Sequence, residues 1–149
     1  MTLSILFFIS FISKIPALSF GNNNIGFSKI SYDKERKECT AIFPISGKFE
    51  GIDALEAPPN SWAKSSNNHF AVWIIHLKSK GSFMLPKTIK GINRSIYVLK
   101  NTNIELNEYS ISPNSKIELF SDKNVNLFNN GNNTRILMLQ GRPINEPVE

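Results

Sequence analysis

The chain has 149 residues, enough for one ordinary domain and too few for a second one of typical size. Its hydrophobic content of 41% excludes a disordered chain, because disordered segments lack the apolar residues that a core requires. The net charge of +5 raises the question of a polyanionic partner. However, the basic residues are scattered singly, and the one cluster, residues 34–37, is interleaved with acidic residues. We therefore expect a solvated basic surface and no nucleic-acid partner.

The first predicted element is an apolar leader over residues 1–20, in which Leu3 to Ile12 form a nearly unbroken apolar run. This run is too short to span a hydrocarbon core about 30 Å thick, so we predict no transmembrane helix. The small residues Ala17 to Ser19 are typical of a signal cleavage site, although a positive n-region is missing. A cleaved signal peptide and a leader created by a displaced gene start both stay open. The localisation therefore stays open too, and a membrane partner is not expected beyond a signal peptide.

The next segment, residues 21–39, is Asn-rich and then charged, without an apolar period, which predicts a linker or a disordered stretch. It ends in Cys39, the single cysteine of the chain. One cysteine excludes an intramolecular disulfide and a thiolate-rich metal site. We interpret Cys39 as a structural thiol, because the neighbouring sequence offers no partner for a nucleophile.

The remaining residues, 40–149, read as one all-β domain. Residues 69–78 are β-branched and aromatic with apolar side chains on both faces, which predicts a central core strand. Residues 51–63 contain Pro58 and Pro59 and predict an ordered loop or corner. The other predicted strands are residues 40–45, 82–85, 95–100, 103–106, 109–111, 116–120, 124–128 and 134–140. Short strands separated by turn formers, with no helical period between them, indicate a sandwich or a barrel.

Five blocks of this domain form a distinctive series: Ala57-Pro58-Pro59-Asn60-Ser61-Trp62-Ala63, Ala71-Val72-Trp73, Phe83-Met84-Leu85-Pro86, Arg94-Ser95-Ile96-Tyr97-Val98 and Leu137-Met138-Leu139-Gln140-Gly141-Arg142-Pro143-Ile144-Asn145-Glu146-Pro147-Val148. In this order they resemble the C-terminal half of pirin-family proteins, and the last block is the most specific. The resemblance covers about 100 residues. It implies a single antiparallel jelly-roll barrel of the cupin (RmlC-like) type and a cytoplasmic protein.

The pirin family also implies a second barrel. Pirins are bicupins, in which the N-terminal barrel holds an iron-type metal through three His and one Glu, while the C-terminal barrel usually carries none. Activities reported in the family are quercetin cleavage by a dioxygenase and transcriptional co-regulation. Here residues 1–39 contain no His and are too few for a barrel, and the family's sequence continues beyond the point where this chain ends. We therefore expect a truncated bicupin, without a cofactor of its own.

A search for catalytic residues gives no candidate set. The two histidines, His69 and His76, stand seven apart on one predicted strand, so alternation points them to opposite faces. His76 stays only a weak candidate for a metal ligand, and we predict no catalytic, cofactor-binding or metal-binding residue. A barrel interior can hold a flat ligand, and Trp73 and Tyr97 are the candidates to line such a cavity, although a core role is favoured for these aromatic residues.

Residues 142–147, near the end of the last block, follow a strong strand and are held extended by two prolines. The resemblance places them near the junction of two barrels, so we expect a partner face there, formed by Arg142, Pro143, Asn145, Glu146 and Pro147. An exposed apolar junction recruits a partner, which predicts a homodimer or binding to a separate cupin barrel. The function we expect is a non-catalytic interaction or structural module, or the remnant of a bicupin. The alternatives are a metal-dependent, quercetinase-like dioxygenase completed by a separately supplied barrel, and a binding protein like a transcription co-regulator.

Overall fold

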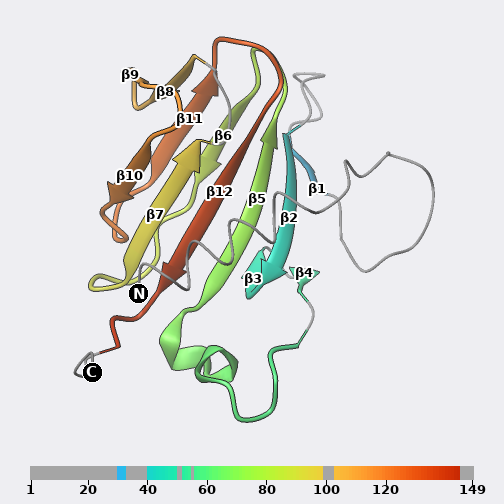
Figure 1. Ribbon diagram of the computed structural model, residues 1–149, viewed down its shortest axis with the longest axis vertical. Helices are drawn as coiled ribbons and strands as arrows, with labels where there is room; N and C mark the ends of the chain where they lie inside the picture. Colours follow the sequence, from blue (N-terminus) through green and yellow to red (C-terminus); the bar gives the residue numbers. More distant parts are fainter. Residues whose placement is uncertain (1–29, 33–39, 50–51, 55, 99–102, 145–149) are drawn as a thin grey trace, which may run out of the picture.

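In the computed structural model, residues 30–32, 40–49, 52–54, 56–98 and 103–144 are described, and nearly all their regular structure is strand (Figure 1). The strands are β1 (Ile30–Tyr32), β2 (Thr40–Ser46), β3 (Lys48–Phe49), β4 (Ile52–Asp53), β5 (Ala71–Leu77), β6 (Ser82–Leu85), β7 (Asn93–Val98), β8 (Ile104–Leu106), β9 (Tyr109–Ile111), β10 (Lys116–Leu119), β11 (Val125–Asn129) and β12 (Thr134–Gly141). Two 3-10 turns, η1 (Trp62–Lys64) and η2 (Ser66–Asn68), precede β5. The all-β class that the sequence predicts is confirmed.

The strands form two main antiparallel sheets and one small hairpin. The larger sheet has the order β1-β2-β5-β12-β7-β10, the second has the order β6-β11-β8-β9, and β3 pairs with β4. Within the described ranges, the hydrogen-bonded ladders do not close into a continuous barrel. The two predicted interior strands, β5 and β12, lie beside each other in the middle of the larger sheet.

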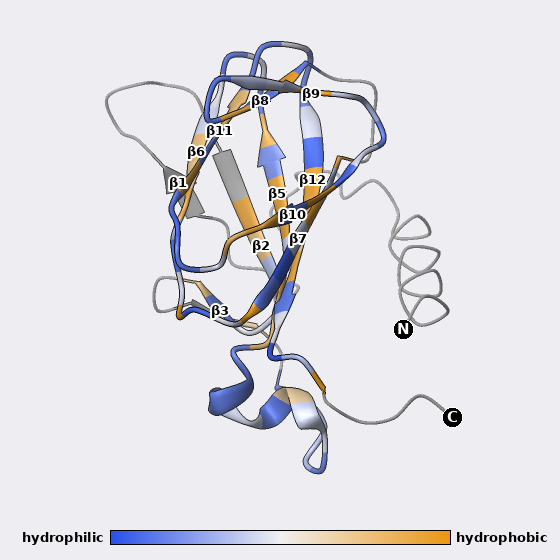
Figure 2. Ribbon diagram, turned by 90° about the vertical axis from the view of Figure 1, so that its left-hand side faces the viewer, coloured by the Kyte–Doolittle hydropathy of each residue, from blue (hydrophilic) through white to orange (hydrophobic). Residues whose placement is uncertain are grey.

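The core lies between the two sheets and follows from the alternation of side chains along each strand. On β12, Ile136 and Met138 point into the core, as do Ile75 and Leu77 on β5. The second sheet contributes apolar side chains such as Leu127. Apolar residues accordingly concentrate on the strands in Figure 2, and hydrophilic residues in the connecting turns. Burying such side chains contributes about 1.5–3 kcal/mol each, which makes this face the main source of stability.

The opposite face of the larger sheet, called the outer face from here on, is also apolar in part. Val72 on β5 and Leu137 on β12 belong to this face and are nevertheless buried. Leu137 is flanked across the sheet by Ile74 of β5 and Tyr97 of β7. This second apolar surface explains why β5 and β12 lack the polar alternation of a strand that is wet on one side.

One buried amide closes the sheets at the end where β5 and β11 finish. The Asn129 side chain is fully buried, and its Nδ2 atom donates to the carbonyl oxygens of Leu77 (3.2 Å), Lys78 (3.0 Å) and Asn132 (2.7 Å). Its Oδ1 atom accepts from the N–H of Gly131 at 3.0 Å. The Asn129 amide thus has hydrogen-bond partners for both its oxygen and its nitrogen. It joins chain segments that the hydrogen-bond ladders between strands do not connect.

Two differences from the predicted elements concern the expected linker and His69. The expected linker at residues 21–39 contains a strand, because β1 pairs with β2 over Ile30–Tyr32. His69 lies outside the core strand; it follows η2 in a left-handed conformation with a φ of 47°, and β5 begins at Ala71. Among the described residues of the predicted loop 51–63, most lack regular structure, apart from the short strand β4 and the start of η1.

Candidate functional site

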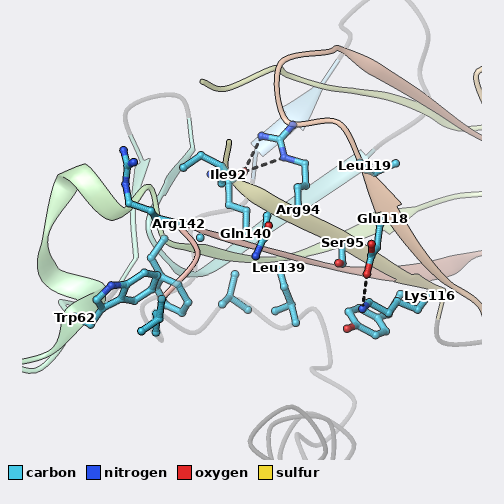
Figure 3. Close-up of a pocket in the computed structure, with 16 residues that line it drawn as sticks. Trp62, Ile92, Arg94, Ser95, Lys116, Glu118, Leu119, Leu139, Gln140 and Arg142 are labelled. Atoms are coloured by element: carbon cyan, nitrogen blue, oxygen red, sulfur yellow. Dashed lines mark hydrogen bonds and ion pairs between the residues drawn. The ribbon is translucent and has the colours of Figure 1, made fainter. Parts of the chain in front are cut away.

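The outer face of β5, β12, β7 and β10 is hollowed into a groove of about 690 Å³ (Figure 3). Its lining is mainly apolar in the middle, aromatic at one end and charged at the other. The lining residues are Trp62, Phe70, Val72, Ile92, Asn93, Arg94, Ser95, Tyr97, Lys116, Glu118, Leu119, Leu139, Gln140, Gly141, Arg142 and Ile144. A mostly apolar concavity of this size, with a few polar groups at its rim, is typical of ligand sites.

The aromatic end is built by Trp62 of η1 and Phe70, whose rings meet edge to face with centroids 5.6 Å apart. Trp62 can lie there only because β12 ends in a glycine. A Cβ atom on Gly141 would stand 2.9 Å from Cη2 of Trp62 and 3.4 Å from Cδ2 of Phe70. The Trp62 side chain remains 37% exposed, so it offers a partly open aromatic edge to a ligand.

The charged end is formed by two side chains of β10. Lys116 Nζ donates to Glu118 Oε1 at 2.9 Å, and both side chains are exposed. This hydrogen bond raises the pKa of Lys116, and the nearby Tyr97 hydroxyl adds to the effect. Lys116 is therefore a permanent cation at neutral pH, held next to a carboxylate on the same rim.

The end of β12 is fastened to the loop that carries Trp62. The backbone N–H of Arg142 donates to the carbonyl of Asn68 (2.8 Å), and its Nε donates to the carbonyl of Asn67 (3.0 Å). Asn68 Nδ2 in turn donates to the carbonyl of Trp62 at 2.8 Å. Residues 57–63 and 137–144 thus meet at this groove, and hydrogen bonds from Arg142 and Asn68 to backbone carbonyls fix the Trp62 loop in place.

Behind the groove, Arg94 makes a second connection. Its Nε and Nη2 atoms donate to Gln140 Oε1 (3.0 and 2.7 Å), and Nη1 donates to the carbonyl of Pro86 (2.7 Å). Gln140 Nε2 donates to the carbonyl of His69 at 3.0 Å. Arg94 is only 3% exposed, and burial lowers its pKa. In Figure 3 its guanidinium points to the other side of the sheet from the Trp62 ring, so it holds the strands together rather than facing the groove.

The two histidines lie far from each other. His69 precedes β5, whereas His76 lies near its far end, and the five strand steps from Ala71 to His76 alone span about 17 Å. His76 is partly buried on the outer face, and its pKa is lowered by burial and then by Arg135 and Lys78. In the described part of the chain, no three His, Cys, Asp or Glu side chains are close enough to share a metal ion.

The two aromatic residues proposed from the sequence lie on opposite faces of the larger sheet. Tyr97 lines the outer groove. Trp73 points into the packed core, where its ring meets Phe49 edge to face at 4.9 Å. Its buried Nε1 has no hydrogen-bond acceptor among the described residues. The two side chains therefore do not share a cavity.

The predicted partner face is described only in part. Arg142 and Pro143 are exposed, and Ile144 beside them is 55% exposed. Asn145, Glu146 and Pro147 lie outside the described residues, as do Cys39 and the leader. In the ranges that are described, no helix has the length and apolarity needed to cross a membrane.

The sequence reasoning did not identify the contacts of Arg94, Gln140 and Gly141. A signal for Arg94 was present, because its position has the same parity as Ile92 and Ile96, which are both buried. The alternation of side chains along a strand therefore predicts that Arg94 points toward the core, although a charged side chain is usually exposed. Nothing local indicates that Gly141 lies under Trp62, since its backbone lacks the positive φ that would demand glycine.

Comparison with known proteins supports the fold. No protein-family model matches the chain, and no curated protein matches it in sequence. A solved structure described as quercetin 2,3-dioxygenase from Acinetobacter baumannii matches with a TM-score of 0.61 and 19% identity, over 83% of this chain and 39% of that chain. The Cupin_2 domain of an XRE family transcriptional regulator from Enterobacter cloacae matches with a TM-score of 0.50 and 14% identity, over 70% and 98% of the two chains.

These similarities show a cupin fold, as the sequence predicts. The chain spans about two fifths of the dioxygenase and nearly all of the regulator's domain. One similar structure is an enzyme and the other is a domain of a regulator, so the fold is compatible with both classes of function.

Proposed function

We propose that this chain is a non-catalytic cupin module that acts by binding, and that it corresponds to the C-terminal cupin domain of a pirin-like bicupin. The observation that carries the proposal is the filled space between its sheets. A catalytic cupin needs several nitrogen or oxygen ligands that converge inside the barrel around an open position for substrate. Here that space is occupied by apolar side chains, including Trp73, Phe49 and Phe83.

The binding surface is the outer groove. Its floor of Val72 and Leu139 excludes water from one side of a ligand, and the edge of Trp62 contacts the ligand's face or rim. Lys116 and Glu118 at the far end supply one donor and one acceptor. This combination suits a flat aromatic molecule that carries polar groups at one end.

The bicupin origin rests on the five sequence blocks and agrees with the partial coverage of the dioxygenase. A dioxygenase completed by a separate metal-bearing barrel stays the second candidate, because the fold shared with that enzyme is compatible with it. In that case the purified chain alone should still hold no metal, and activity should appear only when the second barrel is added.

Adding a separately produced metal-bearing barrel separates the two functions, and metal analysis of the purified full chain tests whether the chain holds a catalytic metal of its own. We expect far less than one equivalent of iron, manganese or nickel, and no loss of quercetin absorbance in the presence of oxygen. A stoichiometric metal that is lost in His76→Ala, or quercetin turnover by the chain alone, would overturn the non-catalytic assignment. His69→Ala is the matched control, because the other histidine lies at the opposite end of β5.

The groove is tested by fluorescence, because the chain has only two tryptophans. Quercetin serves as the probe. We expect it to quench Trp73→Phe, whose remaining tryptophan lies in the groove, more strongly than Trp62→Phe, whose remaining tryptophan lies in the core. Trp73→Phe is a suitable control because Nε1 of Trp73 has no acceptor in the described core. Equal quenching of the two variants would contradict binding in the groove.

A further inference from the structure

β10 is the last strand at one edge of the larger sheet, among the strands that the structure describes. Its register with β7 places Ile117 opposite Ile96 and Lys116 opposite Tyr97. One step earlier, Val98 N–H donates to the carbonyl of Ser115 at 3.1 Å, which marks that pair as hydrogen-bonded. Pairs alternate along an antiparallel ladder, so the backbone groups of Ile117 point toward β7, and those of Lys116 and Glu118 point away from it. Among the described strands, none lies beyond this edge.

This edge is open to solvent and ends in a large apolar side chain. The Lys116 and Glu118 side chains are 47% and 79% exposed, and Phe120, directly after the strand, is 82% exposed. Free strand edges pair readily with another chain, and charged residues on them normally suppress that pairing. On β10 the two charged residues, Lys116 and Glu118, have opposite sign and stand two residues apart. They repel a strand that brings a like charge opposite them, and they favour the register that brings opposite charges together.

We propose that a second copy of this chain pairs with β10 in antiparallel orientation, about a two-fold axis at Ile117. In this register the outward-pointing backbone groups of Lys116 face those of Glu118 of the second copy, and the reverse pair forms across the axis. Each hydrogen-bonded pair then carries opposite charges. A register shifted by two residues in one direction would place Lys116 opposite Lys116 of the second copy, and a shift in the other direction would place Glu118 opposite Glu118. Repulsion between like charges disfavours both registers.

The same register gives Phe120 a partner surface. Phe120 falls opposite Asn114 of the second copy, so its ring packs on the Pro113–Asn114 turn there. The interface thereby joins two larger sheets into one, and the charged end of one groove continues into the charged end of the other. The proposed pairing rests only on the geometry of the strand edge and on its charges. It does not depend on the proposal that the groove binds a ligand.

Charge variants of the full chain test this pairing by sedimentation equilibrium. We expect the wild type to dimerise with increasing concentration, while Lys116→Glu and Glu118→Lys each weaken dimerisation by about tenfold or more, because each creates like-charged pairs. Mixing the two single variants should restore a dimer, since each Glu then faces a Lys of the other chain. The double variant K116E/E118K should dimerise like the wild type.

The mixture separates pairing between copies from the bond within one chain, because both single variants lack the internal Lys116–Glu118 bond. Glu118→Pro provides a second test, since it removes an outward N–H that the chain's own sheet does not use. It should abolish dimerisation and keep the circular dichroism spectrum. Lys123→Glu, an exposed change outside β10, is the control. A wild type that stays monomeric at millimolar concentration, or a dimer that is indifferent to these variants, would overturn the proposal.

Discussion

The ring of Trp62 lies against Gly141, with its Cη2 atom 2.9 Å from where a Cβ at that residue would stand. The contact joins the first 3-10 turn to the last residue of β12 and sets the aromatic end of the groove. Because the φ of Gly141 lies outside the left-handed region, space alone requires a glycine there.

Gly141→Ala should therefore destabilise the fold by about 1–3 kcal/mol, the usual cost of overpacking. In a Trp62→Ala background the same change should stabilise by about 0.4–1 kcal/mol, because alanine restricts the unfolded chain and its Cβ then meets only the Phe70 ring, 3.4 Å away. Urea denaturation of the four proteins measures this reversal of sign. An equal effect of Gly141→Ala in both backgrounds would show that the Trp62 ring is not the reason why residue 141 must be a glycine.

Gln140 and Arg94 should be energetically coupled, so replacing both should cost less stability than the sum of the two single losses. Gln140→Leu takes two of the three hydrogen bonds from a buried guanidinium, and we expect a loss of about 3–5 kcal/mol, as for a buried charge left without its partner. The double variant Arg94→Met/Gln140→Leu should lose less than the sum of the single losses, since no unpaired charge remains. Denaturation midpoints and slopes of the complete cycle test this, and additive losses would count against the coupling.

Asn129→Asp should make stability strongly pH-dependent. A carboxylate at this fully buried position would replace the Nδ2 donor and face three carbonyl oxygens, which raises the pKa of the aspartate in the folded state. A folded pKa above the unfolded value of about 3.9 means that the folded state binds the proton more tightly, so stability falls as the pH rises above about 4. Thermal unfolding at several pH values measures the effect. Asn126→Asp, at an exposed position of the same strand, should lack it.

His76 should lower the stability of the wild type in mild acid. Burial, Arg135 and Lys78 lower its folded pKa, so the unfolded state binds the proton more tightly. The stability associated with neutral His76 is therefore complete above about pH 6.5 and falls as the pH drops through the lower folded pKa. His76→Gln should remove this loss, which chemical denaturation at pH 7.5 and at pH 5 detects. Parallel pH dependence in the two proteins would contradict the assignment.

The strands were largely predictable, because a strand is marked locally by β-branched and aromatic residues and by turn-forming residues at its ends. The predicted ranges for β6 and β9 equal those observed, and the central position expected for residues 69–78 agrees with β5. The cupin resemblance rested on blocks of sequence and agrees with the solved structures that match. β1 was missed because three residues are too few to show a period.

The sequence by itself determined the all-β class and the order of the strands along the chain. Only the tertiary structure decided that Arg94 meets Gln140, 46 residues away, and that Arg142 reaches Asn67, 75 residues away. It also placed Trp73 and Tyr97 on opposite faces and left β10 as an edge. The reason is physical: alternation with a period of two is a property of neighbouring residues, whereas these contacts depend on strand order and register, which the packing of the whole chain selects.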